Sequence, residues 1–192
     1  MKLAKSQLKK IERSVQKIYQ KNNDPYHHFN HAFRTAKLAA YIAKKEKANQ
    51  TVCYVAGLVH DISPKTRGET HGLASSRMAE KLLRKQVLDR YFIRQVCQAI
   101  KYHDTAARRK IKTSEGKIVF DADKLQCLGP VGAIREYGDY LKLSYGHTKV
   151  IKITLDYLKN NNPPLFTKTG RSLKIPLKKF NLEFVRLYNE YK

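Results

Sequence analysis

The chain has 192 residues, which suits one domain, because a single hydrophobic core commonly serves roughly 100–200 residues. Its 39 Lys and Arg outnumber its 16 Asp and Glu, and the resulting formal net charge of +23 predicts a surface that attracts polyanions. No stretch approaches the roughly 18 apolar residues of a membrane span, and the three cysteines form no CxxC pair. These features argue against a membrane protein or a disulfide framework, so we expect a soluble cytoplasmic protein.

Hydrophobic periodicity predicts an all-α fold. Apolar residues recur at steps of three and four, beginning with Leu8, Ile11 and Val15, and this spacing places them on one face of a helix. After a first helix that ends at Asn-Asn-Asp-Pro-Tyr, helices are expected over residues 31–47, 51–61, 71–86, 88–102 and 114–127, with two more in the C-terminal third. The last one is expected to start around Pro176, since a first helical turn tolerates proline.

A loop is predicted after the third helix. Residues 63–68 read Ser-Pro-Lys-Thr-Arg-Gly, in which proline lacks an amide hydrogen and glycine tolerates positive φ. The loop follows directly on His60 and Asp61, so Lys65 is expected to lie close to that pair.

The adjacent His60 and Asp61 stand at the end of the apolar third helix. A carboxylate there is costly unless it is paired or bound to a cation. Neighbouring helical residues point about 100° apart, but both can turn toward one ion where the helix ends. The pair would supply one nitrogen and one oxygen ligand, and two further side chains would complete the protein's share of the site.

Two other segments offer such side chains. His31 and Arg34 share a helix face, and they suit a metal and a phosphate oxygen respectively. The stretch Ile-Val-Phe-Asp-Ala-Asp-Lys-Leu contains Asp121 and Asp123, which lie about 200° apart on a helix, so only one of them faces a site squarely. A metal-free cluster, in which buried His and Asp satisfy one another by hydrogen bonds, is the alternative.

In chain order, His31, the His60-Asp61 pair and Asp123 resemble the metal-binding residues of the HD-domain superfamily of metal-dependent phosphohydrolases. Flanking segments are similar to those of small stand-alone bacterial HD hydrolases: DPYHHFNHAFRTAKLA, AGLVHDIS, GKIVFDADKLQCLGPVGAIREYG and TKTGRSL. The resemblance extends over roughly residues 24–191. It implies an all-α HD-domain helical bundle that forms a single compact domain over 1–192, with a core at about 24–140 and C-terminal helices at about 147–192.

The resemblance also implies a metal site. It assigns His31, His60, Asp61 and Asp123 to a divalent ion. Asp123 is preferred over Asp121 because it matches the aspartate of the superfamily pattern Ala-Asp-Arg/Lys-Leu. Asp121 is then expected to contact the metal ligands without binding the ion itself, or to cap a helix. Mixed nitrogen and oxygen ligands suit Mn, Fe, Ni, Co or Zn better than Mg, and the resemblance favours Mn or Fe.

His71 and His103 resemble positions that hold a second metal in binuclear relatives such as the symmetrical diadenosine-tetraphosphate hydrolases. A contact to phosphate is the alternative for both residues, and a site with a single metal is the competing interpretation. One or two divalent ions per chain are therefore expected.

The implied reaction is hydrolysis of a phosphate ester or pyrophosphate bond in a nucleotide or related phosphorylated small molecule, by metal-activated water. Catalytic roles fall to His60 and Asp61, while Arg34 and Lys65 would hold phosphate and neutralise developing charge; Arg135 is a further candidate. Alarmone hydrolases carry an acidic pair shortly after their His-Asp, whereas Ile-Ser-Pro-Lys follows here, which argues against guanosine tetraphosphate.

A different class of function stays open. The net charge of +23 is also compatible with a catalytically silent HD-fold protein that binds nucleotides or nucleic acid, although no aromatic-basic RNA motif supports this. The excess charge could equally serve solubility. Binding to a membrane is not expected, and the sequence does not indicate an oligomeric state.

Overall fold

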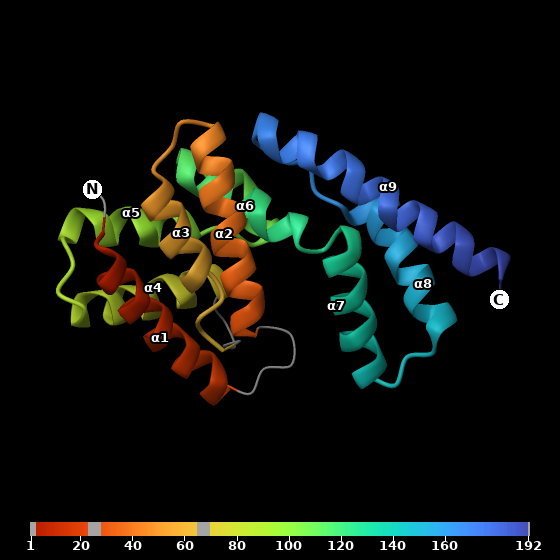
Figure 1. Cartoon of the computed structure of the whole chain (residues 1–192), viewed down its shortest axis with the longest axis horizontal. Coiled ribbons are helices and arrows are strands. Elements are labelled where there is room, and N and C mark those ends of the chain that lie inside the picture. Colours follow the sequence, from red (N-terminus) through yellow and green to blue (C-terminus); the bar gives the residue numbers. More distant parts are fainter. Residues whose placement is uncertain (1–2, 23–27, 65–69, 192) are drawn as a thin grey trace.

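The computed structural model describes residues 3–22, 28–64 and 70–191, and this described part consists of helices and connections without a strand (Figure 1). The all-α prediction is therefore confirmed. The α-helices are α1 Lys5–Asn22, α2 Phe29–Lys45, α3 Gln50–Val59, α4 His71–Lys85, α5 Arg90–Ile100, α6 Ser114–Leu125, α7 Gly129–Lys142, α8 His147–Asp156 and α9 Lys168–Glu190. A 3₁₀-helix, Thr105–Lys110, follows α5, and a π-helical turn, Tyr157–Asn161, continues α8.

Side-chain caps fix where several of these helices begin. Asn49 accepts hydrogen bonds from the backbone amides of Thr51 and Val52 at the start of α3, and Asp89 and Thr113 cap α5 and α6 in the same way. Such caps satisfy amides that have no partner inside the helix. The predicted helices from the second to the sixth agree with α2 to α6 to within a few residues at each end.

Two predictions for the C-terminal third are wrong. Three α-helices occur there instead of two, and α9 starts at Lys168, so that Pro176 lies inside the helix. The start of α9 is set upstream of the proline, because the Thr167 hydroxyl accepts a hydrogen bond from the amide of Gly170. Pro176 has no amide hydrogen to donate to the carbonyl of Ser172, and α9 continues through this position without that hydrogen bond.

Helix α3 forms the centre of the bundle and packs against α2, α5 and α6. Between Val52 and Val59 every side chain except that of Tyr54 is buried, as expected for a helix that is apolar all round. Gly57 lets α2 approach closely, because a Cβ at this position would lie 2.6 Å from the Cα of Ala36. This close approach brings the first turn of α2 beside the end of α3.

Replacing Gly57 with alanine is expected to destabilise the protein by about 1–3 kcal/mol, because backbone atoms of α2 would have to move away. For a chain of this size the melting temperature would fall by roughly 3–9 °C. The control is Gly138→Ala, since no atom lies within 4 Å of a Cβ there and alanine favours the helix. Thermal unfolding of the two variants measures the difference, and equal melting temperatures would contradict the close approach.

The last three helices pack on one another at one end of the bundle, as Figure 1 shows. This group begins with α7 at Gly129, earlier in the chain than the predicted start of about 147. Helix α9 also contacts α6 and α2, and the backbone amide of Gly129 donates to Asn181 on α9. These contacts join the C-terminal helices to the helices that carry the site.

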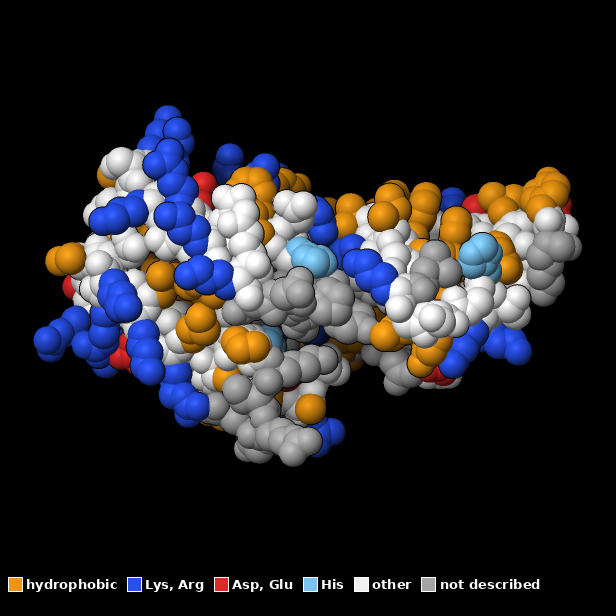
Figure 2. Space-filling view, turned by 90° about the horizontal axis from the view of Figure 1, so that it is seen from below, with side chains coloured by type: hydrophobic (Ala, Val, Ile, Leu, Met, Phe, Trp, Pro, Cys, Tyr) orange, Lys and Arg blue, Asp and Glu red, His pale blue; other side chains and the backbone are white. Residues whose placement is uncertain are grey.

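Lys and Arg side chains are spread over the face of the molecule that Figure 2 shows, and few Asp or Glu side chains appear among them. On this face the positive charge is thus distributed and not confined to one patch. None of the described helices is long and apolar enough to cross a membrane.

Candidate metal centre

Three helices bring four buried side chains to one point. His31 lies in the first turn of α2, His60 and Asp61 directly follow α3, and Asp123 lies in α6. Each offers a nitrogen or an oxygen, and these four atoms lie within 4.8 Å of one another. The structure therefore brings together all four residues that the sequence assigned to a metal.

Most of the distances between these atoms match those between ligands of one ion. His60 Nε2 lies 3.1 Å from Asp61 Oδ2 and 3.5 Å from Asp123 Oδ1, and His31 Nε2 lies 3.3 Å from Asp123 Oδ1 and 3.8 Å from Asp61 Oδ2. Ligand atoms bound at about 2.0–2.2 Å with angles between about 90° and 110° are about 2.8–3.6 Å apart, so His31 and Asp61 would have to move slightly closer together. The cluster could therefore hold a divalent ion without large rearrangement.

The orientation of His60 gives an independent reason for a cation. Its Nδ1 lies 2.9 Å from the carbonyl oxygen of Gly57, which can only accept, so Nδ1 carries the hydrogen. In the neutral ring the lone pair of Nε2 would face two carboxylate oxygens, so this buried nitrogen is satisfied only when it carries a proton or binds a cation. Burial alone would lower the pKa of His60, but the carboxylates of Asp61 and Asp123 raise it to about 10. The site thus favours a positive charge at this nitrogen.

His31, Asp61 and Asp123 are in the protonation states that bind metal ions. Burial lowers the pKa of His31 to about 4, only partly offset by its hydrogen bond with Asp123, so the imidazole is neutral at pH 7. Burial would raise the pKa of both carboxyl groups, but neighbouring cationic and hydrogen-bonding groups hold the pKa of Asp61 and of Asp123 well below the usual range. Both carboxylates are therefore ionised.

Two more histidines reach the opposite side of Asp61. His71 is the first residue of α4, His103 follows α5, and the Nε2 atoms of both lie 2.9 Å from Asp61 Oδ1. His103 Nδ1 lies 2.8 Å from the carbonyl oxygen of Ile100, an arrangement that repeats the one at His60. One carboxylate thus stands between two groups of imidazoles, and its two oxygens face different groups.

Two arginines lie beside the cluster. Arg34 is one turn along α2 from His31, and its Nε donates to Gln126 Oε1 at 3.1 Å. Arg135 on α7 donates from Nη1 to the backbone oxygen of Gln126 at 3.4 Å. Burial, followed by the nearby charge of Arg135, lowers the pKa of Arg34. The guanidinium groups therefore lie on the same side of the site, held by one residue of the α6–α7 connection.

Sequence reasoning missed Lys124 and Gln126. The Lys124 Nζ lies 2.7 Å from Asp123 Oδ2, and only 17% of its side chain is exposed. Its position in the Ala-Asp-Lys-Leu pattern was the available signal, because the residue that follows a buried carboxylate on a helix can fold back on it.

Asp121 does not join the cluster. The carboxylate of Asp121 points to the start of α9, where it accepts hydrogen bonds from the amides of Phe166 and Thr167 and from the Thr167 hydroxyl, at 2.7–2.8 Å. Lys65 lies outside the described residues, so its predicted phosphate contact stays a prediction.

Comparison with known proteins places the chain in a family. Residues 28–128 match the HD domain. YpgQ of Bacillus subtilis is 32% identical over 176 residues, covering 83% of this chain and 82% of that protein. A crystal structure of a predicted HD superfamily hydrolase from an uncultured Thermotogales bacterium is similar, with a TM-score of 0.71, 28% identity and coverage of 96% of this chain and 93% of that one.

The crystal structure of YpgQ in complex with ADP superposes with a TM-score of 0.74 and covers 97% of this chain and 95% of that one. Identity over this structural alignment is 23%, so the superposition shows a shared fold. The 32% identity of the two sequences is the evidence that they are related. With the HD match spanning more than half of the residues, the chain belongs to the HD-domain family.

Proposed function

We propose that this protein is a metal-dependent phosphohydrolase that acts on a nucleotide or a related phosphorylated small molecule. The observation that carries the proposal is the buried Nε2 of His60, which faces the carboxylates of Asp61 and Asp123 beside the neutral His31. Membership of the HD family and a likeness to a predicted HD superfamily hydrolase support the reaction class. The ADP complex of YpgQ supports a nucleotide as the substrate class.

In this proposal His31, His60, Asp61 and Asp123 hold a divalent cation. Two nitrogen and two oxygen ligands suit Mn or Fe, and also Ni, Co or Zn, better than Mg, which prefers oxygen ligands. The bound ion would lower the pKa of a water molecule and polarise a phosphoryl oxygen. His71 and His103, which share Asp61 Oδ1, serve either a second cation or a contact to phosphate.

The remaining charges of the site favour an anionic substrate. With neutral histidines, Asp61, Asp123 and Lys124 together carry one negative charge, which a divalent cation converts to one positive charge. Arg34 adds a planar guanidinium that can bind two phosphate oxygens at once, with its Nε held by Gln126. We assign Arg34 to phosphate binding and Arg135 to support on the same side.

Metal uptake is expected to release about one proton per ion at pH 7–8. The raised pKa of His60 means that the metal-free site holds a proton on this ring, whereas His31 is neutral and both carboxylates are ionised. Because the ion needs the unprotonated nitrogen, its apparent affinity should rise as the pH approaches 10 and fall in acid. Calorimetry of Mn binding in two buffers with different ionisation enthalpies measures this release, and identical heats would contradict it.

The function is tested by screening purified protein with Mn, Fe, Co, Ni, Zn or Mg against nucleoside di- and triphosphates, dinucleoside polyphosphates and p-nitrophenyl phosphate. The proposal expects turnover of at least one phosphate compound with a transition metal and its loss in Asp61→Ala. Equal turnover by both proteins would refute the assignment of the site. Absence of turnover with every metal, although one ion binds, would indicate a binding protein instead.

A further inference from the structure

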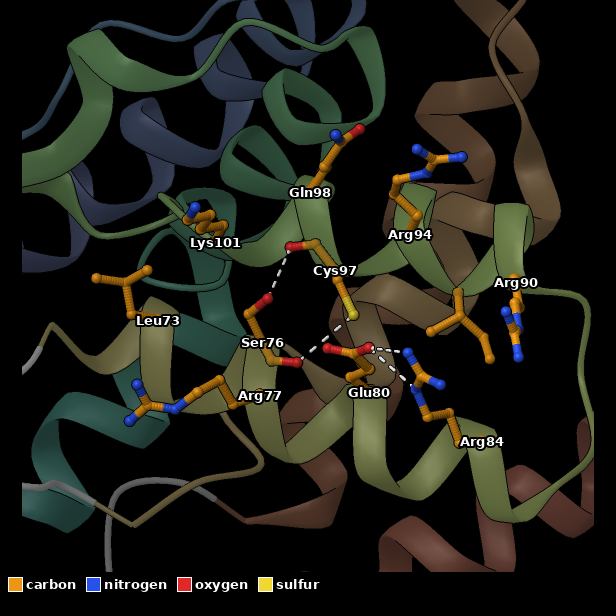
Figure 3. Close-up of a pocket in the computed structure, with 11 residues that line it drawn as sticks. Leu73, Ser76, Arg77, Glu80, Arg84, Arg90, Arg94, Cys97, Gln98 and Lys101 are labelled. Carbon is orange, nitrogen blue, oxygen red and sulfur yellow. Dashed lines mark hydrogen bonds and ion pairs between the residues drawn. The ribbon is translucent and has the colours of Figure 1, made fainter.

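Helices α4 and α5 enclose a cavity of ≈ 640 Å³ that lies outside the metal cluster (Figure 3). At its base the two helices are joined by two contacts. The Ser76 hydroxyl donates to the carbonyl of Cys97 at 3.2 Å, and the Cys97 thiol donates to the carbonyl of Ser76 at 3.5 Å. Ile93 adds a buried apolar side chain to the lining. The cavity is thus a groove whose partly apolar base is bridged by two hydrogen bonds between α4 and α5.

Cationic side chains dominate the lining of this groove. Its acidic residue is Glu80, which already accepts two hydrogen bonds from Arg84, at 2.7 and 3.0 Å. The cationic residues that line it are Arg77, Arg84, Arg90, Arg94 and Lys101. Like charges that gather around one cavity repel one another, and a bound anion would relieve this repulsion.

The cations form two groups, one toward each end of the groove. Figure 3 shows Arg77 and Lys101 toward the end near Leu73, and Arg84, Arg90 and Arg94 toward the other end. Seven residues separate Arg77 from Arg84 on α4 and also Arg94 from Lys101 along α5 and its end, which corresponds to about 10 Å of helix. The helix positions that carry the two groups of cations are therefore about 10 Å apart along the groove.

This separation selects the kind of anion. A single phosphate group reaches only one of the two groups of cations. A single nucleic-acid strand carries one phosphate at every nucleotide along its length, so successive phosphates of one strand can reach both groups. An extended chain of phosphates therefore fits both ends, whereas a compact anion fits one.

An exposed aromatic side chain continues the groove. Tyr91 is 61% exposed, and the Arg94 guanidinium lies 5.8 Å from the centre of its ring. Tyr91, Arg94 and Gln98 also line an adjoining hollow, in which Glu115 is the acidic residue. A basic groove that follows the backbone, together with an aromatic ring on which a base can stack, is typical of proteins that bind single strands without reading their sequence.

We propose that the α4–α5 groove binds single-stranded nucleic acid through its phosphate backbone, with Tyr91 as a stacking platform. The cations come from two helices at spacings of four and seven residues, so they form no contiguous basic motif in the sequence. This binding does not depend on the metal centre, because the members of the metal cluster are not among the residues that line the groove.

The test is fluorescence anisotropy of a labelled 12-nucleotide oligouridylate, titrated with the full chain in EDTA at several salt concentrations. EDTA keeps the metal centre out of the measurement, so the result is independent of the proposed hydrolase activity. The groove variant is Arg77→Gln combined with Arg94→Gln. Its matched control is Arg13→Gln combined with Arg109→Gln, which removes the same charge from exposed positions on α1 and on the 3₁₀-helix.

The proposal expects the groove variant to bind at least tenfold more weakly than the control variant, and its salt slope to fall by about 1.4, because each lost phosphate contact removes about 0.7. Tyr91→Ala should also weaken binding about tenfold, whereas Tyr41→Ala, another exposed tyrosine, should not. Equal weakening by the two double variants would overturn the proposal in favour of diffuse attraction. Competition by tripolyphosphate as strong as that by the unlabelled oligonucleotide would overturn it in favour of a compact anion.

Discussion

Asp61→Asn is expected to abolish stoichiometric metal binding and to slow hydrolysis by about 10³-fold or more. The carboxylate lies 3.1 Å from His60 Nε2, and its other oxygen lies 2.9 Å from the Nε2 atoms of His71 and His103. Asparagine has the same shape but no charge, so it cannot balance a divalent ion. Metal content by elemental analysis, together with kcat against the best substrate of the screen, measures both effects.

Asp121→Asn is the matched control, because it makes the same change in a buried aspartate two residues from Asp123. Its carboxylate accepts three hydrogen bonds at the start of α9, and the asparagine amide replaces one acceptor oxygen with a donor. We expect a loss of stability of about 1–3 kcal/mol with the metal content preserved. If Asp121→Asn lost the metal while Asp61→Asn kept it, the ion would have to bind elsewhere.

Lys124→Met is expected to destabilise the metal-free protein by about 3 kcal/mol, because the buried carboxylates of Asp123 and Asp61 must then share the one charge of the protonated His60. Burial would lower the pKa of Lys124, but the charge of Asp123, 2.7 Å away, raises it, so the ammonium is firmly charged. A divalent cation at the cluster would replace the lost positive charge. Addition of Mn should therefore stabilise the variant more than it stabilises the natural protein.

Thermal unfolding in EDTA and in Mn tests this expectation. The melting temperature of Lys124→Met in EDTA should fall by roughly 10 °C, and Mn should recover most of the loss. Lys44→Met, an exposed lysine on α2, serves as the control and should change little. A Lys124→Met protein that is as stable in EDTA as the natural protein would show that Asp123 does not need this cation.

The burial of His60 and Asp61 at the end of a helix was predictable because its signals are local. An apolar helix that ends in His60 and Asp61 demands a charged partner, and caps such as Asn49 and Asp89 fix the helices around it. The residues alone left open whether Asp121 or Asp123 faces the site. In the structure Asp121 instead accepts hydrogen bonds from the amides of Phe166 and Thr167, in the segment directly before α9.

Features that arise from contacts distant in sequence were not predictable. Nothing in the local sequence around His71 or His103 shows that both imidazoles meet the same oxygen of Asp61. The helical path of α9 through Pro176 depends on a cap two turns earlier, and local propensity alone favoured a start at the proline. The basic groove likewise exists only because α4 and α5 pack against each other.

A crystal structure of the protein grown with Mn, measured at a wavelength where Mn scatters anomalously, tests the central claim most directly. The account predicts an anomalous peak about 2.0–2.3 Å from the Nε2 atoms of His31 and His60 and from carboxylate oxygens of Asp61 and Asp123. Anomalous density confined to other parts of the protein, with these four side chains hydrogen-bonded only to one another, would contradict it.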